Sequence, residues 1–141
     1  MRNRTRGREY ALQMLYQADI RHAGRAQILE EFWGEEEQPP AEVKAFANEL
    51  FTGTLDHLET VDALIARHAD NWDIKRMAVI DRNILRLGVF ELLHLDDVPP
   101  KVSIKGAIEL AKRFGDADSS KFINGILDAI HKTTHAAKPD G

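Results

Sequence analysis

The chain has no cysteine and no long apolar run, and both absences narrow what it can be. Without cysteine among its 141 residues, it can form no disulfide, no thiolate metal site and no cysteine nucleophile. No run approaches the roughly 20 apolar residues that span a bilayer. No charged leader followed by an apolar stretch indicates secretion either. These absences favour a cytoplasmic protein with no membrane contact.

Recognisable catalytic and metal-binding motifs are also missing. The sequence contains no nucleophile elbow, no phosphate-binding glycine loop and no zinc-protease helix. Of its six histidines, only His131 and His135 have the i, i+4 spacing that places two ligands on one helical face. They lie where the last helix should fray, and no third ligand is near in sequence. We therefore expect neither a metal, nor a cofactor, nor an enzymatic activity.

Negative charge exceeds positive charge overall, but the N-terminal end is basic. The net charge is −4, yet residues 1–25 carry six arginines against Glu9 and Asp19, a balance of +4, so the remainder sums to −8. A body that is acidic with one basic end is typical of a protein with a single patch that faces a polyanion.

The periodic segments all indicate helices, and no alternating stretch indicates a strand. We predict an all-α fold, a single compact bundle of about six helices over residues 1–141. The first four helices are expected at 5–20, 26–33, 41–69 and 75–95. The apolar stripe of 41–69 keeps its phase across Gly53, and that of 75–95 is apolar nearly all round, which is typical of a central helix.

Two shorter helices complete the bundle. Ser103 is the predicted N-cap of the fifth, Gly115 its left-handed C-terminal cap, and Asp118 or Ser119 begins the sixth. Thr5 is expected to cap the first helix, whose packed face includes Ile20. A flexible arginine-rich arm (1–8) and a frayed tail (133–141) flank the bundle.

The arginine-rich arm is the first candidate site. An extended chain would point Arg2, Arg4, Arg6 and Arg8 to one side, whereas a helix would splay them and leave only Arg4 and Arg8 on one face. Arginine binds phosphate bidentately and stacks on bases. The arm is therefore either an RNA-binding element or a solvated, disordered terminus.

The turn from Asp118 to Phe122 is the second candidate site. With Asp118 as the cap, the amides of Ser119, Ser120 and Lys121 would point outward beside the Lys121 ammonium and form a seat for a phosphate. Phe122 lies at the edge of its helix's apolar stripe, where a half-exposed ring can stack on an unpaired base. Periodicity alone favours the simpler interpretation, in which Asp118 caps the helix and Phe122 packs.

Three further residues stand out within the helices. Tyr16 lies on the apolar side of the first helix, and Asp81 lies in the first turn of the fourth, where the helix dipole favours an acid. Glu91 falls inside the apolar stripe of its helix, so its carboxylate needs a partner and we interpret it as structural.

Several strings in the same order resemble the NusB family of bacterial transcription antitermination factors. They are the alternating arginines with Glu9, the run 11–17 (ALQMLYQ), the run 98–115 beginning Val98-Pro99-Pro100, and the run 118–128 beginning Asp118-Ser119-Ser120. The similarity extends to about Ile130 and is weakest between Arg21 and Glu42. One departure is Lys105-Gly106, where NusB proteins commonly have an asparagine and an acid, which puts a role of these two positions in RNA or partner binding in doubt.

The resemblance implies a function for each candidate. Arg2, Arg4, Arg6, Arg8, Asp118, Ser119, Lys121 and Phe122 would bind RNA, while Tyr16 and Asp81 would hold the partner NusE, a small-subunit ribosomal protein, on a side away from Phe122. The protein would be a non-catalytic adaptor that, with NusE, binds single-stranded boxA RNA of nascent ribosomal RNA transcripts. RNA polymerase, with other Nus factors, then reads through terminators.

Two alternatives remain open at this point. Some ribosomal RNA methyltransferases carry a NusB-like N-terminal domain, in which case the chain would be a fragment. The other is a bundle that binds proteins only and whose arginines are incidental. The sequence also leaves open whether the free protein is a monomer or a homodimer.

Overall fold

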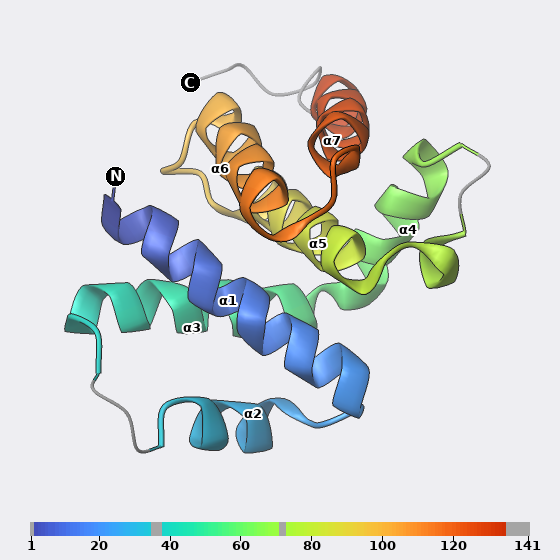
Figure 1. Cartoon of the computed structure of the whole chain (residues 1–141). Coiled ribbons are helices and arrows are strands. Elements are labelled where there is room, and N and C mark those ends of the chain that lie inside the picture. The colour runs from blue at the N-terminus through green and yellow to red at the C-terminus, as the bar shows by residue number, and fades with distance from the viewer. Residues whose placement is uncertain (1, 35–37, 71–72, 135–141) are drawn as a thin grey trace.

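The computed structural model describes residues 2–34, 38–70 and 73–134, in which every regular element is helical (Figure 1). In chain order the elements are α1 (Arg2–Arg21), α2 (Arg25–Phe32), α3 (Ala41–Asp56), α4 (Leu58–His68), a 3₁₀ helix η1 (Ile74–Arg76), α5 (Val79–His94), α6 (Pro100–Phe114) and α7 (Ser119–Thr134). The all-α prediction is confirmed.

Helix α5 is the centre of the bundle. It packs against α1, α3, α4, α6 and α7, and its second half is buried on all sides, from Asn83 to Leu92 except Arg86. Burying one leucine, isoleucine or phenylalanine side chain contributes roughly 1.5–3 kcal/mol, so this helix supplies a large share of the folding free energy. The prediction that the fourth apolar segment lies in the middle of the bundle is confirmed.

Helix α1 crosses α3 at close range, and this crossing fixes the basic end of the protein. A Cβ at Gly7 would lie 2.6 Å from the Phe46 ring of α3, so only glycine permits the approach. In Figure 1, α1 runs diagonally across α3, while α6 and α7 lie on the other side of it. The N-terminal half of α1 is therefore bounded by α3 and α6.

The predicted helix 41–69 is wrong as a single element, because the chain turns at His57 and forms α3 and α4. His57 has φ −112° and ψ 19°, and its ring stacks on His94 at 3.9 Å between centroids. The stripe keeps its phase across a turn of one residue, so periodicity cannot reveal it. Gly53 lies within α3 and not at this turn, and a Cβ there would clash with the Phe90 ring of α5.

The N-terminal predictions also need correction. Residues 2–8 are helical and not a flexible arm, so Thr5 lies inside α1 and does not cap it. Ile20, which was assigned to the packed face, is 49% exposed. At the other end, α7 continues through Thr133 and Thr134 without fraying, and the rest of the predicted tail, 135–141, lies outside the described residues.

Both predicted caps of α6 are wrong. The helix begins at Pro100, whose fixed φ suits the first helical position, and Ser103 is buried within it. Gly115 has φ −90° and ψ −172°, which is extended and not left-handed backbone. Glycine is needed there for space, because a Cβ would lie 2.5 Å from Oγ of Ser119.

Candidate nucleic-acid and partner interface

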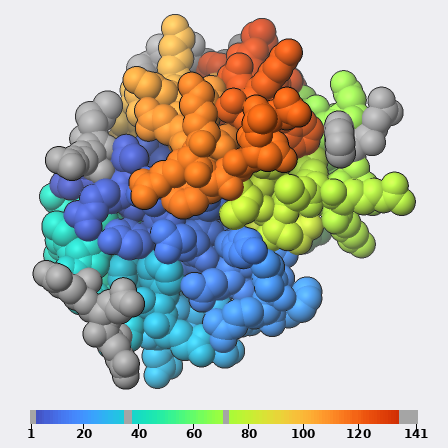
Figure 2. All heavy atoms as spheres, viewed as in Figure 1, coloured from blue at the N-terminus to red at the C-terminus, as the bar shows by residue number. Residues whose placement is uncertain are grey.

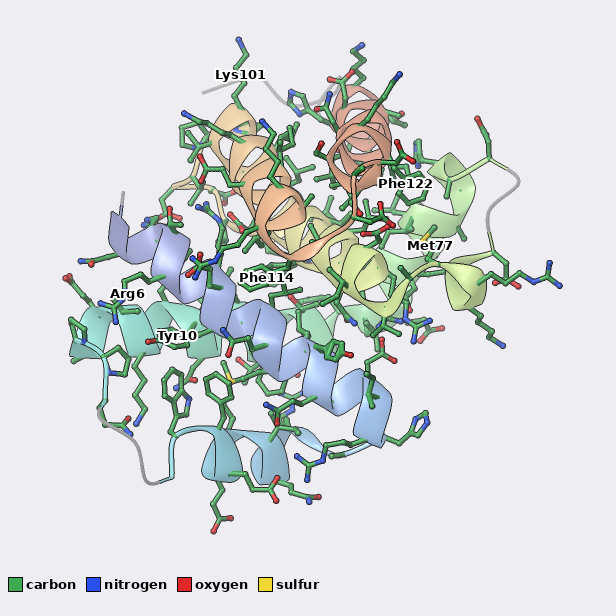
Figure 3. The ribbon with its side chains drawn as sticks, viewed as in Figure 1. Arg6, Tyr10, Met77, Lys101, Phe114 and Phe122 are labelled. Carbon is green, nitrogen blue, oxygen red and sulfur yellow. The ribbon has the colours of Figure 1, made fainter. Side chains whose placement is uncertain are left out.

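The arginines of α1 are splayed by the helix into different environments. Arg4 lies with its Cζ 4.7 Å from the centre of the Phe46 ring, and its Nη2 is 3.1 Å from a carboxylate oxygen of Asp97. Arg6 donates to the Tyr10 hydroxyl at 3.3 Å, and Figure 3 shows the side chains of Arg6 and Tyr10 over α3. Arg4 and Arg6 remain accessible to a ligand, since Arg4 is 38% exposed and Arg6 is half-buried.

Arg8 is different, because its guanidinium is buried in an ion pair with Glu91 of α5. Its Nε and Nη2 each donate to Glu91 at 2.8 Å, and the two side chains are only 5% and 1% exposed. The Ser103 hydroxyl also donates to Glu91 at 3.0 Å. This burial argues against the predicted RNA contact of Arg8, whereas Glu91 has the partner that its burial requires.

Gly106 explains how Arg8 reaches Glu91. A Cβ at position 106 would lie 2.8 Å from both Cζ and Nε of Arg8, so a side chain there would displace the guanidinium. The departure from the family pattern at Lys105-Gly106 thus has a structural consequence, namely space for the buried ion pair. Lys105 is exposed.

The turn between α6 and α7 is organised by the Ser119 hydroxyl. This hydroxyl accepts from the Asp116 amide at 3.0 Å and donates to a carboxylate oxygen of Asp81 at 2.7 Å. The Ser119 amide donates to the Asp116 carbonyl at 3.2 Å. Ser119 is buried and its polar groups are engaged within the protein, which argues against its predicted RNA contact.

A cavity of about 270 Å³ opens beside this turn, between the start of α5 and the start of α7. Phe122 lines it and is half-buried, as its position at the edge of the apolar stripe predicts. Asp118 also lines it and is exposed, and Lys121 is exposed one residue before Phe122. We call this the Phe122 cavity; its lining residues are Met77, Ala78, Asp81, Asp116, Asp118, Ser119 and Phe122.

Asp81 belongs to the Phe122 cavity, which corrects the expected separation of two binding sides. Its carboxylate accepts from Ser119 and lines the same cavity as the Phe122 ring. Tyr16 is half-buried on α1. Met77 and Ala78 also line the cavity; they lie between η1 and α5, whereas the predicted helix 75–95 included both. Figure 3 shows Met77 and Phe122 on the same side of the molecule.

A network of charges holds the start of α5 against α1. Arg82 donates to Asp19 from Nε at 2.7 Å and from Nη2 at 2.9 Å, and Arg86 bridges Asp19 and Asp62. Burial alone would raise the pKa of Asp19, but hydrogen bonds from Arg82 and Asn83 and the charge of Arg86 hold it below its usual value. The hydrogen bond from Arg82 to Asp19 correspondingly raises the pKa of Arg82. This network fixes the helix that carries Asp81.

The described residues contain neither a candidate metal site nor a candidate membrane span. Within residues 2–34, 38–70 and 73–134, no group of three or more histidine, cysteine, aspartate or glutamate side chains could hold a metal, and His135 lies outside these ranges. No helix in the same ranges is long and apolar enough to cross a membrane.

Comparison with known proteins gives a consistent result over nearly the whole chain. The model of the NusB family matches residues 5–132. A Myxococcus xanthus protein named transcription antitermination protein NusB is 49% identical over 131 residues, which cover 90% of this chain and 93% of the relative. The solved structure of NusB from T. maritima is 41% identical, with a TM-score of 0.84 over 92% of this chain and 90% of that one.

A second solved structure contains a complex. It is described as antitermination factors NusB and NusE in complex with double-stranded RNA. The matched chain is 32% identical, with a TM-score of 0.85 over 94% of this chain and 98% of that one.

Proposed function

Because this chain belongs to the NusB family, we propose that it is a transcription antitermination factor that binds RNA as a non-catalytic adaptor. It acts in the cytoplasm with RNA polymerase and the other Nus factors. With NusE it holds the boxA segment of a nascent ribosomal RNA transcript, so that the polymerase reads through terminators. The complex of NusB, NusE and RNA among the related structures supports this choice of partners.

The Phe122 cavity is the observation that carries the proposal. It is lined by the half-buried ring of Phe122 and by the exposed Asp118, and Lys121, one residue before Phe122, is exposed beside it in sequence. Unpaired bases bind proteins through these groups: the ring stacks on the base, polar atoms meet its edge and a cation meets the phosphate. With Arg8 and Ser119 removed from the set, the proposed RNA contacts are Arg2, Arg4, Arg6, Asp118, Lys121 and Phe122.

Tyr16 and Asp81 are the proposed contacts of NusE. Since Asp81 lines the Phe122 cavity, NusE and RNA would meet at the start of α5 and α7. Two half-sites joined by a protein–protein contact add their binding free energies, so RNA should bind more tightly when NusE is present.

Two other functions are weaker candidates. A domain of a ribosomal RNA methyltransferase would belong to a much longer protein, whereas the match covers 93% of the Myxococcus xanthus relative. A bundle that binds proteins only leaves the accessible arginines and Lys121 without a role.

A titration with and without NusE tests the proposal. Fluorescence anisotropy of a labelled single-stranded boxA RNA, at fixed salt, should show weak binding to this protein alone and tighter binding with NusE. An equal affinity in both titrations would contradict the shared site. A pull-down that retains NusE but no RNA under any condition would favour the protein-only bundle.

A further inference from the structure

Three lysines of α6 form a ridge that no candidate site includes. Lys101, Lys105 and Lys112 are exposed, and at roughly 100° per residue they fall within a sector of about 40°. The buried residues of the helix lie on the opposite side: Ser103, Gly106, Ala107, Leu110 and Ala111. We call the three side chains the α6 lysine ridge, and Figure 3 shows Lys101 pointing away from the body of the protein.

The ridge carries positive charge that the protein does not neutralise. Within the described ranges, none of its lysines has an ion pair or a side-chain hydrogen bond. Most arginines, by contrast, lie within ion-pair distance of a carboxylate: Arg4, Arg8, Arg21, Arg25, Arg82, Arg86 and Arg113. An acidic protein with three unmatched cations in line has a local positive potential there, whatever its net charge.

The position of the ridge relates it to the proposed RNA contacts. On one flank of α6, two grooves of about 120 and 140 Å³ separate the helix from α1 and are lined by Thr5 and Arg8. On the other flank α6 packs against α7, which begins at the Phe122 cavity. Figure 2 shows α6 projecting between α1 and α7. Helix α6 thus lies between the proposed RNA contacts on α1 and those at the start of α7.

Length and spacing suit a single strand. With a rise of about 1.5 Å per residue, Lys101 and Lys105 are separated by about 6 Å along the axis, and the whole ridge extends over about 16 Å. The one carboxylate on the same helix, Glu109, is exposed and lines both grooves toward α1, and Lys105 lines one of these grooves as well. Flexible ammonium groups neutralise successive phosphates without reading sequence.

From these observations we infer that the α6 lysine ridge binds the phosphate backbone of single-stranded RNA between the basic end of α1 and the Phe122 cavity. This inference rests on the proposed function and adds a binding surface to it. If it holds, the salt dependence of RNA binding should exceed what Arg4, Arg6 and Lys121 alone would produce.

The test compares two triple variants of the whole protein with equal charge. One is Lys101→Gln, Lys105→Gln and Lys112→Gln; the control is Arg25→Gln, Arg67→Gln and Lys132→Gln, which removes three cations from α2, α4 and the far end of α7, of which Arg67 and Lys132 are exposed and Arg25 is half-buried. Affinity for a fluorescein-labelled single-stranded boxA RNA is measured by anisotropy from about 50 to 300 mM salt. Each lost phosphate contact lowers the log–log slope by roughly 0.7, so the ridge variant should lose about 2 and the control far less.

The outcomes separate the ridge from the proposed function. Equal slopes for the two variants, with normal binding by the unmodified protein, would overturn the ridge alone. No RNA binding by the unmodified protein, with or without NusE, would overturn the proposed function and the ridge with it. If the ridge variant binds RNA like the control but loses NusE, the ridge is a protein contact and the inference is wrong.

Discussion

The basic end of α1 and the turn before α7 both show clusters of charged and polar residues, but the bundle treats them differently. In α1, the Arg8 guanidinium is buried and donates two hydrogen bonds to Glu91. In the turn, the Ser119 hydroxyl donates to Asp81, while Asp118 and Lys121 are exposed and Phe122 is half-buried. A charged residue near a binding surface is therefore unlike its neighbours when the protein has buried it in an ion pair, as it has buried Arg8.

The largest expected effect is the loss of stability when the buried ion pair between Arg8 and Glu91 is broken. Glu91→Ala would leave the Arg8 guanidinium buried and unpaired, so it should lower the free energy of unfolding by about 3–5 kcal/mol in a urea titration. The matched control is Asp97→Ala, which removes the partner of Arg4. That pair is exposed, and its loss should cost less than about 1 kcal/mol. Similar losses for both variants would contradict the distinction.

Replacing Phe122 tests the role of the turn before α7 in RNA binding. Phe122→Ala should weaken RNA binding by about 1–3 kcal/mol, because a stacked base loses its platform. Its stability loss should be below the ~3–5 kcal/mol typical of a fully buried phenylalanine. Ile126→Ala, one turn later and buried, should lower the melting temperature and leave RNA affinity per folded molecule unchanged.

The same variant tests how close NusE and RNA lie. Since Asp81 shares the Phe122 cavity, Phe122→Ala should also reduce the gain in RNA affinity that NusE provides. Titrations with and without NusE measure this gain. An undiminished gain would place the NusE contact away from the cavity.

Arg4 and Arg6 sharpen the comparison within α1. Replacing both with alanine should lower the log–log salt slope of RNA binding by roughly 1.4, if each contacts one phosphate. The melting temperature should change little, because neither side chain is buried. An unchanged slope would show that these two arginines, like Arg8, serve the fold.

The smallest effect concerns the half-buried network at Asp19. A carboxylate whose pKa is lowered in the folded state stabilises the fold above its unfolded pKa, about 4, and this contribution is lost as the pH falls through the lower folded value. Asp19→Asn should therefore destabilise the protein at pH 7. The difference from the unmodified protein should shrink in urea titrations at pH 4 and below. A constant difference would mean that Asp19 acts through hydrogen-bond geometry and not through charge.

Much of the fold could be predicted because it depends on local periodicity. The apolar stripe located α5, although the predicted helix 75–95 starts four residues before Val79, and α7 begins at Ser119 as predicted. Glu91 inside an apolar stripe correctly implied a partner. The errors arose where long-range packing decides. The turn at His57, the burial of Ser103 and the space required at Gly115 all depend on residues distant in sequence, which no local pattern reports.

The candidate site shows the same limit. The sequence identified Phe122 as an edge residue and Asp81 as an acid in a first turn, and both descriptions hold. It gave no indication that Ser119 would join them in one cavity, since that hydrogen bond connects residues 38 positions apart. Nor could it show that Arg8, unlike Arg4 and Arg6, is buried.

The close fit of Gly106 against Arg8 has a consequence for how this protein can vary. Positions 8, 91, 103 and 106 form one physical unit, because the glycine makes room for the guanidinium that the glutamate and the serine surround. Single substitutions at 106 should be deleterious in a mutational scan, yet become tolerated when Arg8 is replaced by a smaller residue and Glu91 by an apolar one. Such epistasis would make position 8 resistant to stepwise change.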